Sequence, residues 1–293
     1  MKRVALMLVT IILGFTVVFS GCLLLLQDQM IYFPRQYSRA DIYRAEQHDR
    51  TSLLEYETSE GGQTVFLVRP RDEDLERPEF VWFIFGGNAT VALDLLDYFD
   101  GFPEDGHAFV LMDFPGYGQS EGTPAGATIL DSALRARELA AEEFGFDAEE
   151  LSARLGAVGH SLGGAAALEF ARETDARAVV TISPFTSMND MAWRQAGPFA
   201  VLLKRKHRFD NVAVLEMLKE RERPPFVAVV HGEHDPIVPV SMGRRLRDQF
   251  PDLVRYEEIE RGDHNWILDS GRSEIFALMR EGAAQAAEAG RDG

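Results

Sequence analysis

The chain has 293 residues, of which 46% are hydrophobic, and it carries a formal net charge of −17 at pH 7. Binding of nucleic acid needs a net basic face, so this balance excludes a broad nucleic-acid surface. The single cysteine, Cys22, excludes an intramolecular disulfide, and about 260 residues beyond an N-terminal segment suit one large domain.

The N-terminal segment has the length and composition of a membrane anchor. Residues 4–26 are uncharged, and 23 apolar-rich residues are enough to cross a bilayer. Lys2 and Arg3 precede them, which favours a cytoplasmic N-terminus and a domain on the periplasmic or extracellular side. We therefore expect residues 1–30 to form the anchor. None of the catalytic candidates below lies in it, so we expect an active, soluble domain after its deletion.

Two other interpretations of this segment remain open. Phe19-Ser20-Gly21-Cys22 resembles a bacterial lipoprotein-processing site, in which Cys22 is lipidated and becomes the first residue. The Phe and the four leucines after the cysteine depart from the usual pattern. A removed signal peptide is the other alternative. A retained anchor, by either route, is favoured over a secreted protein.

Beyond the anchor, strand-like and helix-like runs alternate. Gly61-Gly62, between two strand-like runs at 53–58 and 64–68, predicts an antiparallel start. The later alternation predicts an α/β fold, with a mostly parallel twisted sheet and helices on both faces. The later runs are strands 80–85, 107–112, 155–158, 176–182, 225–230 and 254–259, and helices 129–144 and 242–250.

A glycine-rich loop follows the long apolar strand at 80–85. It reads Gly86-Gly87-Asn88, and backbone N–H groups in such a loop can stabilise a developing negative charge. We assign the N–H of Asn88 as one donor of an oxyanion hole. An ordinary turn at the end of a strand is the alternative.

The most informative stretch is Gly159-His160-Ser161-Leu162-Gly163, between a predicted strand and a helix-forming run. A Gly-x-Ser-x-Gly in this context is typical of a nucleophile elbow, in which a strained turn projects the serine hydroxyl away from the sheet. Flanking glycines allow the strand and helix backbones to pass close together. Ser161 is therefore the candidate nucleophile, and the N–H of Leu162 is the second oxyanion donor.

About 40 residues separate the sixth predicted strand from the seventh, and many of them are large and apolar. We expect a short cap here, at about 184–215, that covers an apolar substrate group such as an acyl chain. A helix packed on the sheet is the alternative. The candidate pocket residues are Phe185, Met188, Met191, Trp193 and, from a later loop, Trp266. The basic run 204–208 is interpreted as a solvated loop or, alternatively, as a contact for anionic lipid headgroups.

The remaining chemistry follows the last two strands. Asp235 lies in a loop at the C-terminal end of the strand at 225–230, where open parallel sheets place their ligands. His264 follows the strand at 254–259 and is the only histidine after Asp235. His264 is thus the candidate base for Ser161, and Asp235 the acid that orients it. A metal site at His231, His234 and Asp235 is disfavoured, because alternate strand residues point to opposite faces, and we expect no metal.

The Ala/Gly-rich residues 281–293 are expected to fray.

These motifs together resemble the α/β-hydrolase superfamily over roughly residues 50–280, and in particular the branch with serine-aminopeptidase-like hydrolases and membrane-associated depalmitoylases. The matching segments are 85–89, 113–122, 159–164, 183–187, 208–211 and 231–239. The branch usually has His-Gly before the Asn, and this chain has Gly86-Gly87. The resemblance implies an α/β-hydrolase domain over 31–280 with a Ser161–His264–Asp235 triad and no cofactor.

The expected function is a membrane-anchored serine hydrolase that cleaves carboxylic esters or thioesters. The first alternative is an aminopeptidase-like serine peptidase, which needs an acidic group such as Glu233 or Asp263 near the pocket to hold the substrate amine. The second alternative is a non-catalytic binding protein on the same scaffold. The expected partners are a small-molecule or acyl substrate and the membrane; the sequence does not indicate an oligomeric state.

Overall fold

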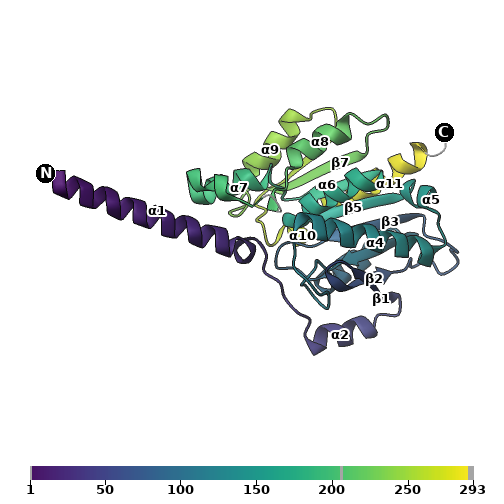
Figure 1. Cartoon of the computed structure of the whole chain (residues 1–293). Coiled ribbons are helices and arrows are strands. Elements are labelled where there is room, and N and C mark those ends of the chain that lie inside the picture. The colour runs from purple at the N-terminus through teal and green to yellow at the C-terminus, as the bar shows by residue number, and fades with distance from the viewer. Residues whose placement is uncertain (1, 205–206, 290–293) are drawn as a thin grey trace.

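The computed structural model describes residues 2–204 and 207–289 (Figure 1). Residues 205 and 206 of the basic run lie outside the described residues. The strands are β1 Thr51–Thr58, β2 Gly61–Val68, β3 Phe80–Phe85, β4 His107–Met112, β5 Leu155–His160, β6 Ala178–Ile182, β7 Phe226–Gly232 and β8 Val254–Ile259. The helices are α1 Lys2–Ile31, α2 Arg39–Glu46, η1 Ala92–Asp94, α3 Leu96–Asp100, α4 Gly126–Phe144, α5 Ala148–Ser152, α6 Leu162–Thr174, α7 Met188–Ala196, η2 Gly197–Leu202, α8 Asn211–Lys219, α9 Val240–Gln249, α10 Ile267–Ser270 and α11 Arg272–Ala289.

The eight strands form one sheet in the order β1-β2-β4-β3-β5-β6-β7-β8. The strand β2 pairs antiparallel with both β1 and β4, and every later pairing is parallel. Thr58 pairs with Gly61 across a tight turn, and Gly61 has the positive φ, +100°, that glycine readily adopts. The predicted antiparallel start and mostly parallel sheet are confirmed.

Both faces of the sheet are covered by helices, as predicted. Successive side chains of a strand point to opposite faces, and all six residues of β3 are buried. Val81, Phe83 and Phe85 join the core that includes α4, α6, α8 and α9. Phe80, Trp82 and Ile84 join the second core, which includes α3, α10 and α11.

The excursion after β6 divides into a cap and a sheet-covering helix. An antiparallel bridge between Ser187 and Asp210 closes its base, with α7 and η2 between them. Beyond the bridge, α8 packs beside α6, and Val214, Leu215 and Leu218 are buried there. Both interpretations of this segment therefore hold, each for one half of it.

The N-terminal helix α1 projects away from the domain, and its C-terminal end lies beside the cap (Figure 1). Within residues 2–204 and 207–289, α1 is the one helix long and apolar enough to cross a membrane. At the other end of the chain, α11 continues through residues 281–289, and Ala283 and Ala286 are buried. Fraying from residue 281 is therefore a wrong expectation for 281–289, because these alanines pack on the sheet; residues 290–293 lie outside the described chain.

Candidate active site

Ser161 occupies the sharp turn between β5 and α6. Its backbone has φ 54° and ψ −116°, a conformation that costs a non-glycine residue energy and must be held by its surroundings. The Ser161 N–H donates to the Ile182 carbonyl at 2.8 Å, and the Ser161 carbonyl accepts from the N–H of Gly164 at 3.0 Å. A Cβ on Gly159 would clash with the carbonyl of Gly163, so the strand and helix cross too closely for any side chain.

Asp235 and His264 form a buried, hydrogen-bonded pair. The Nδ1 of His264 lies 2.6 Å from Oδ2 of Asp235, while Oδ1 of Asp235 accepts from the N–H groups of Ile237 and Val238 at 2.9 and 2.8 Å. Burial acts to raise the pKa of Asp235, but the His264 bond and the two backbone donors outweigh it and hold the pKa below its usual value. An ionised carboxylate only accepts, so Nδ1 of His264 carries the proton and Nε2 is left as an acceptor.

His160 connects this pair to the turn. Its Nε2 lies 3.0 Å from the carbonyl oxygen of His264, and the two rings are 4.8 Å apart. A carbonyl only accepts, so Nε2 of His160 carries the proton. Burial lowers the pKa of His160 to about 3, so the ring stays neutral. The residue before Ser161 thus holds the loop of His264, a role the sequence reasoning missed because the motif allows any residue at that position.

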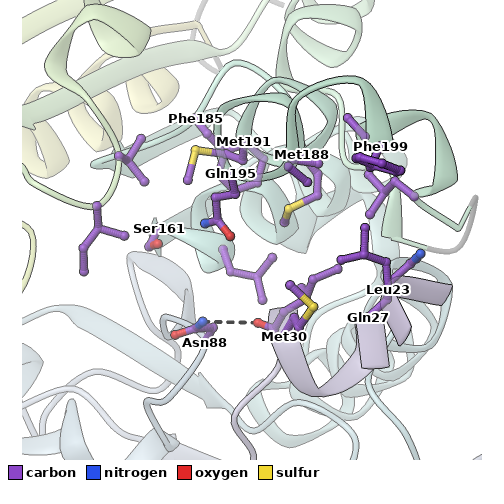
Figure 2. A pocket seen from close by; sticks show the side chains of 18 residues that line it. Leu23, Gln27, Met30, Asn88, Ser161, Phe185, Met188, Met191, Gln195 and Phe199 are labelled. Atoms are coloured by element: carbon purple, nitrogen blue, oxygen red, sulfur yellow. Dashed lines mark hydrogen bonds between the residues drawn. The ribbon is translucent and has the colours of Figure 1, made fainter. Parts of the chain in front are cut away.

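The two proposed oxyanion donors border the same pocket as Ser161. Leu162 is the first residue of α6, where helix N–H groups have no partner within the helix. The Asn88 carbonyl accepts from the Phe33 N–H at 3.1 Å and from the Tyr117 hydroxyl at 2.5 Å. The Asn88 side chain donates to the Ile31 carbonyl at 3.2 Å, so the glycine-rich loop is bonded to the end of the N-terminal helix (Figure 2).

A pocket of about 170 Å³ lies over Ser161, between the cap and the end of α1 (Figure 2). Engineered apolar cavities of about 150 Å³ accept benzene, so this space suits a compact apolar group or part of a chain. The lining residues are Leu23, Gln27, Met30, Ile31, Asn88, Ser161, Leu162, Phe185, Met188, Met191, Ala192, Gln195, Ala196, Phe199, Ala200, Leu203, Ile237 and Val238.

Three of the five expected pocket residues line this space, and two do not. Phe185, Met188 and Met191 border the pocket. Trp193 is 57% exposed and Trp266 is 66% exposed, and neither lines the pocket. On α7 the lining residues recur at helical spacing from Met188, and Trp193, five residues on, lies on the opposite side of the helix. Trp266 lies after His264 in the loop before α10, with its side chain in solvent.

The N-terminal helix also contributes to the pocket, which the sequence reasoning did not foresee. Leu23, Gln27, Met30 and Ile31 line it, and their spacing of four, three and one residues puts them on one side of α1. The expectation of an active domain without residues 1–30 considered only the triad and oxyanion residues, and it stays a prediction; these four residues add a wall of the pocket to that segment. The available signal was Gln27, the polar residue that directly follows the apolar-rich residues 4–26.

Neither acidic residue considered for a peptidase borders the pocket, and none of its described lining residues is Asp or Glu. The Glu233 carboxylate accepts from the Arg261 N–H at 3.2 Å. The Asp263 carboxylate accepts from the N–H groups of Asn265 and Trp266 at 2.8 and 2.9 Å. These bonds hold both carboxylates in loop structure at the surface.

The two histidines of the disfavoured metal site lie in different surroundings. The Nε2 of His231 donates to the Val238 carbonyl at 2.9 Å, inside the core, whereas the His234 side chain is 63% exposed. Over the described ranges, no three His, Cys, Asp or Glu side chains cluster as metal ligands would. The Asp235 carboxylate instead accepts from the N–H groups of Ile237 and Val238 and is bonded to His264.

Comparison with known proteins gives the following similarities. Residues 77–222 match a family model described as serine aminopeptidase, S33. An uncharacterized protein of Mycobacterium tuberculosis is 30% identical over 177 residues, which are 60% of this chain and 59% of that protein. The lysophosphatidylserine lipase ABHD12 of Mus musculus is 28% identical over 158 residues, 48% of this chain and 37% of the lipase.

Among solved structures, an esterase of Pyrococcus furiosus has the same fold, with a TM-score of 0.60 at 14% sequence identity. The alignment covers 87% of this chain and 96% of the esterase. The curated relatives named above are matched over 59% and 37% of their own lengths. The structural similarity therefore concerns the fold, and the sequence similarities concern only the matched part of each relative.

Proposed function

Because the chain is a member of the α/β-hydrolase superfamily, we propose that it is a serine hydrolase that cleaves carboxylic esters or thioesters through an acyl-enzyme on Ser161. The observation that carries the proposal is the 2.6 Å bond between His264 and Asp235. It leaves Nε2 of His264 as an acceptor, and the His160 bond holds this loop beside the strained turn of Ser161.

In the proposed first step, Oγ of Ser161 attacks the substrate carbonyl while its proton passes to Nε2 of His264. The tetrahedral intermediate then collapses, the C–O or C–S bond breaks, and His264 returns the proton to the leaving alcohol or thiol. Water hydrolyses the acyl-enzyme by the same route: His264 takes a proton from water and returns it to Ser161. Asp235 stays ionised throughout and stabilises the imidazolium, a role that its lowered pKa supports.

The negative oxygen of the intermediate is proposed to accept hydrogen bonds from the N–H groups of Asn88 and Leu162. Fixed backbone donors stabilise developing charge without reorganisation, and loss of one typically costs about 10²–10³ in rate. The bonds that hold the Asn88 carbonyl and side chain support this role, because they restrict the movement of the glycine-rich loop.

The pocket favours acyl substrates over peptides. Its cap side is formed by Phe185, Met188 and Met191, and no described lining residue carries a carboxylate that could form an ion pair with a substrate ammonium. A relative named as a lipase supports the same preference. A serine peptidase stays the alternative, which the S33 family match favours. We further propose that α1 anchors the protein in a membrane with the domain outside the cytoplasm.

A fluorophosphonate probe tests the proposal, because it phosphonylates an activated serine and releases fluoride. We expect labelling and ester hydrolysis in the wild type, and loss of both in Ser161→Ala, with Ser241→Ala as the exposed-serine control. In Ser161→Ala or His264→Ala, kcat should fall by about 10⁴–10⁶, and the double variant should be little worse, because the residues act as a unit. Hydrolysis that survives in a folded Ser161→Ala variant would overturn the assignment. Faster cleavage of aminoacyl amides than of acyl esters would favour the peptidase.

A further inference from the structure

The side chain of Gln27 joins the N-terminal helix to the cap. It is only 6% exposed, although it lies in a helix whose first half is bare of protein contacts. Its Nε2 donates to the Leu202 carbonyl at 2.7 Å, and its Oε1 accepts from the N–H of Lys204 at 2.7 Å. Both ends of one amide are thus bonded to the backbone where η2 ends.

Two further contacts join α1 to the cap, and they lie on either side of Gln27 around the helix. The Phe19 ring packs edge-on against Phe199 at 4.9 Å, and Oδ1 of Asp28 lies 2.5 Å from Nε2 of His207. From Phe19 to Asp28 the helix rises about 13 Å, at 1.5 Å per residue. The contact therefore extends over more than two turns and fixes the helix in rotation as well as in position.

Gln27 is the costliest residue to bury on this face, and its bonds explain why it is tolerated. A primary amide without partners loses much free energy on burial, and loss of Gln27 would also leave the Leu202 carbonyl and the Lys204 N–H without their bond. The pairing is specific in direction, since one end donates and the other accepts. It therefore selects one rotation of α1 relative to the cap.

That rotation turns four residues of α1 towards Ser161. Leu23, Gln27, Met30 and Ile31 line the pocket, opposite Met188 and other residues of the cap (Figure 2). We propose that this end of the anchor helix is a wall of the acyl pocket, held in place by Gln27, so that the substrate's acyl chain binds between the anchor and the cap. This inference rests on the proposed ester or thioester hydrolysis.

The surroundings of the pocket indicate where such a chain comes from. The pocket wall continues into the uncharged, exposed part of α1 that is long enough to lie in a bilayer. On the cap, Val201 is 71% exposed and Trp193 points outward, and tryptophan favours the membrane interface. The substrate class is therefore a membrane-resident acyl ester or thioester, whose chain reaches Ser161 from the hydrocarbon without crossing water.

Either route of anchoring preserves this wall. If Cys22 became a lipidated first residue, Leu23, Gln27, Met30 and Ile31 would all remain. The Phe19–Phe199 contact would be lost, but the Gln27 bonds to the cap would not.

The test uses the full chain reconstituted in phosphatidylcholine vesicles and a series of p-nitrophenyl esters from acetate to laurate. Gln27→Leu removes the bonds but keeps an apolar helix, and Gln29→Leu, at an exposed position two residues on, is the matched control. We expect Gln27→Leu to raise KM for the long-chain esters by about tenfold or more, the scale at which apolar pockets discriminate chain length. In the Gln29→Leu control, KM for every ester and fluorophosphonate labelling should stay within about twofold of wild type.

A second pair of variants keeps the test independent of whether Gln27→Leu disturbs the fold. Leu23→Trp should fill the pocket and shift the preferred ester to a shorter chain, whereas Leu25→Trp, at a position 79% exposed, should not. An unchanged chain-length profile in both Gln27→Leu and Leu23→Trp, with normal labelling of Ser161, overturns the inference and leaves the proposed function intact. No labelling and no hydrolysis of any ester by the wild type overturns both.

Discussion

The Nε2 of His160 lies 3.0 Å from the carbonyl oxygen of His264, so the residue before the candidate nucleophile holds the loop of its candidate base. His160→Phe keeps an aromatic ring but removes the donor, and we expect kcat to fall by roughly 10–10² because a small displacement of a catalytic group has this effect. His160→Gln, whose amide can donate from nearly the same point, should recover part of the loss. The measurement is kcat and KM on one ester. Equal losses in the two variants would contradict a role for the bond.

Asp235→Asn tests the tautomer of His264. The two backbone N–H donors of Ile237 and Val238 need an acceptor, so the Asn oxygen should stay with them and its NH₂ should face His264. Nδ1 must then accept, Nε2 carries the proton, and the imidazole no longer takes the proton of Ser161. We expect kcat to fall by about 10⁴ with little change in thermal stability. Retention of more than a tenth of wild-type kcat would argue that the pair is structural.

His107 should make the stability of the fold depend on pH. It is buried, the Trp82 indole N–H donates to its Nδ1 at 3.1 Å, and burial lowers its pKa to about 4. An unfolded histidine titrates near 6.5, so between pH 6.5 and about 4 the unfolded chain binds a proton that the folded chain does not, and stability falls as the pH falls. Across this pH range the lowered pKa of His107 reduces the free energy of unfolding by up to about 3 kcal/mol.

His107→Asn keeps an acceptor near the position of Nδ1 and removes the titration. The variant loses ring packing against Phe102 and should therefore be less stable than wild type at pH 7.5. The difference in melting temperature between the variant and the wild type should shrink at pH 4.5, because there only the wild type loses stability through the low pKa of His107. A deficit that stays constant or grows would show that His107 does not titrate differently in the folded state. Asp113, whose pKa is raised to about 7, acts in the opposite direction but is common to both proteins.

The anchor predicts a specific fractionation. Full-length protein should remain with membranes after extraction at high salt, because burial of the uncharged residues 4–26 in hydrocarbon does not depend on ionic strength. Cys22→Ser should change nothing if α1 is a plain transmembrane helix, and should abolish lipid labelling and processing if the chain is a lipoprotein. Recovery of wild-type protein only in the soluble fraction, shortened by about 21 residues and without lipid, would instead identify a cleaved signal.

The architecture was largely predictable from the sequence because its signals are local. Strands 80–85, 107–112 and 254–259 coincide with β3, β4 and β8, since short apolar or alternating runs bounded by turns determine them. Ser161 occupies a strained turn because the glycines around it permit the close crossing of β5 and α6. Asp235 and His264 meet because the C-terminal ends of parallel strands lie at one edge of the sheet.

What could not be predicted depends on contacts between distant parts of the chain. Gln27 and Leu202 are 175 residues apart, and no local pattern indicates which side of an apolar helix docks on a cap. Trp193 was expected in the pocket on residue type alone, whereas its side of α7 decides that it faces outward. The alanines after residue 281 have little side chain to signal burial, yet Ala283 and Ala286 fit closely because they are small.

The end of the N-terminal helix is hydrogen-bonded directly to the glycine-rich loop of the candidate site. The helix ends at Ile31, whose carbonyl is bonded to Asn88, and the Phe33 N–H is bonded to the Asn88 carbonyl. A hydrolase on a flexible tether would sample a volume of solvent around its attachment point, but this one is fixed to its helix. With α1 in a bilayer, encounters with a membrane-resident substrate are confined to two dimensions. The rate would then follow the mole fraction of substrate among the surrounding lipids, and inert lipid added at constant total substrate would slow the enzyme by dilution within the membrane plane.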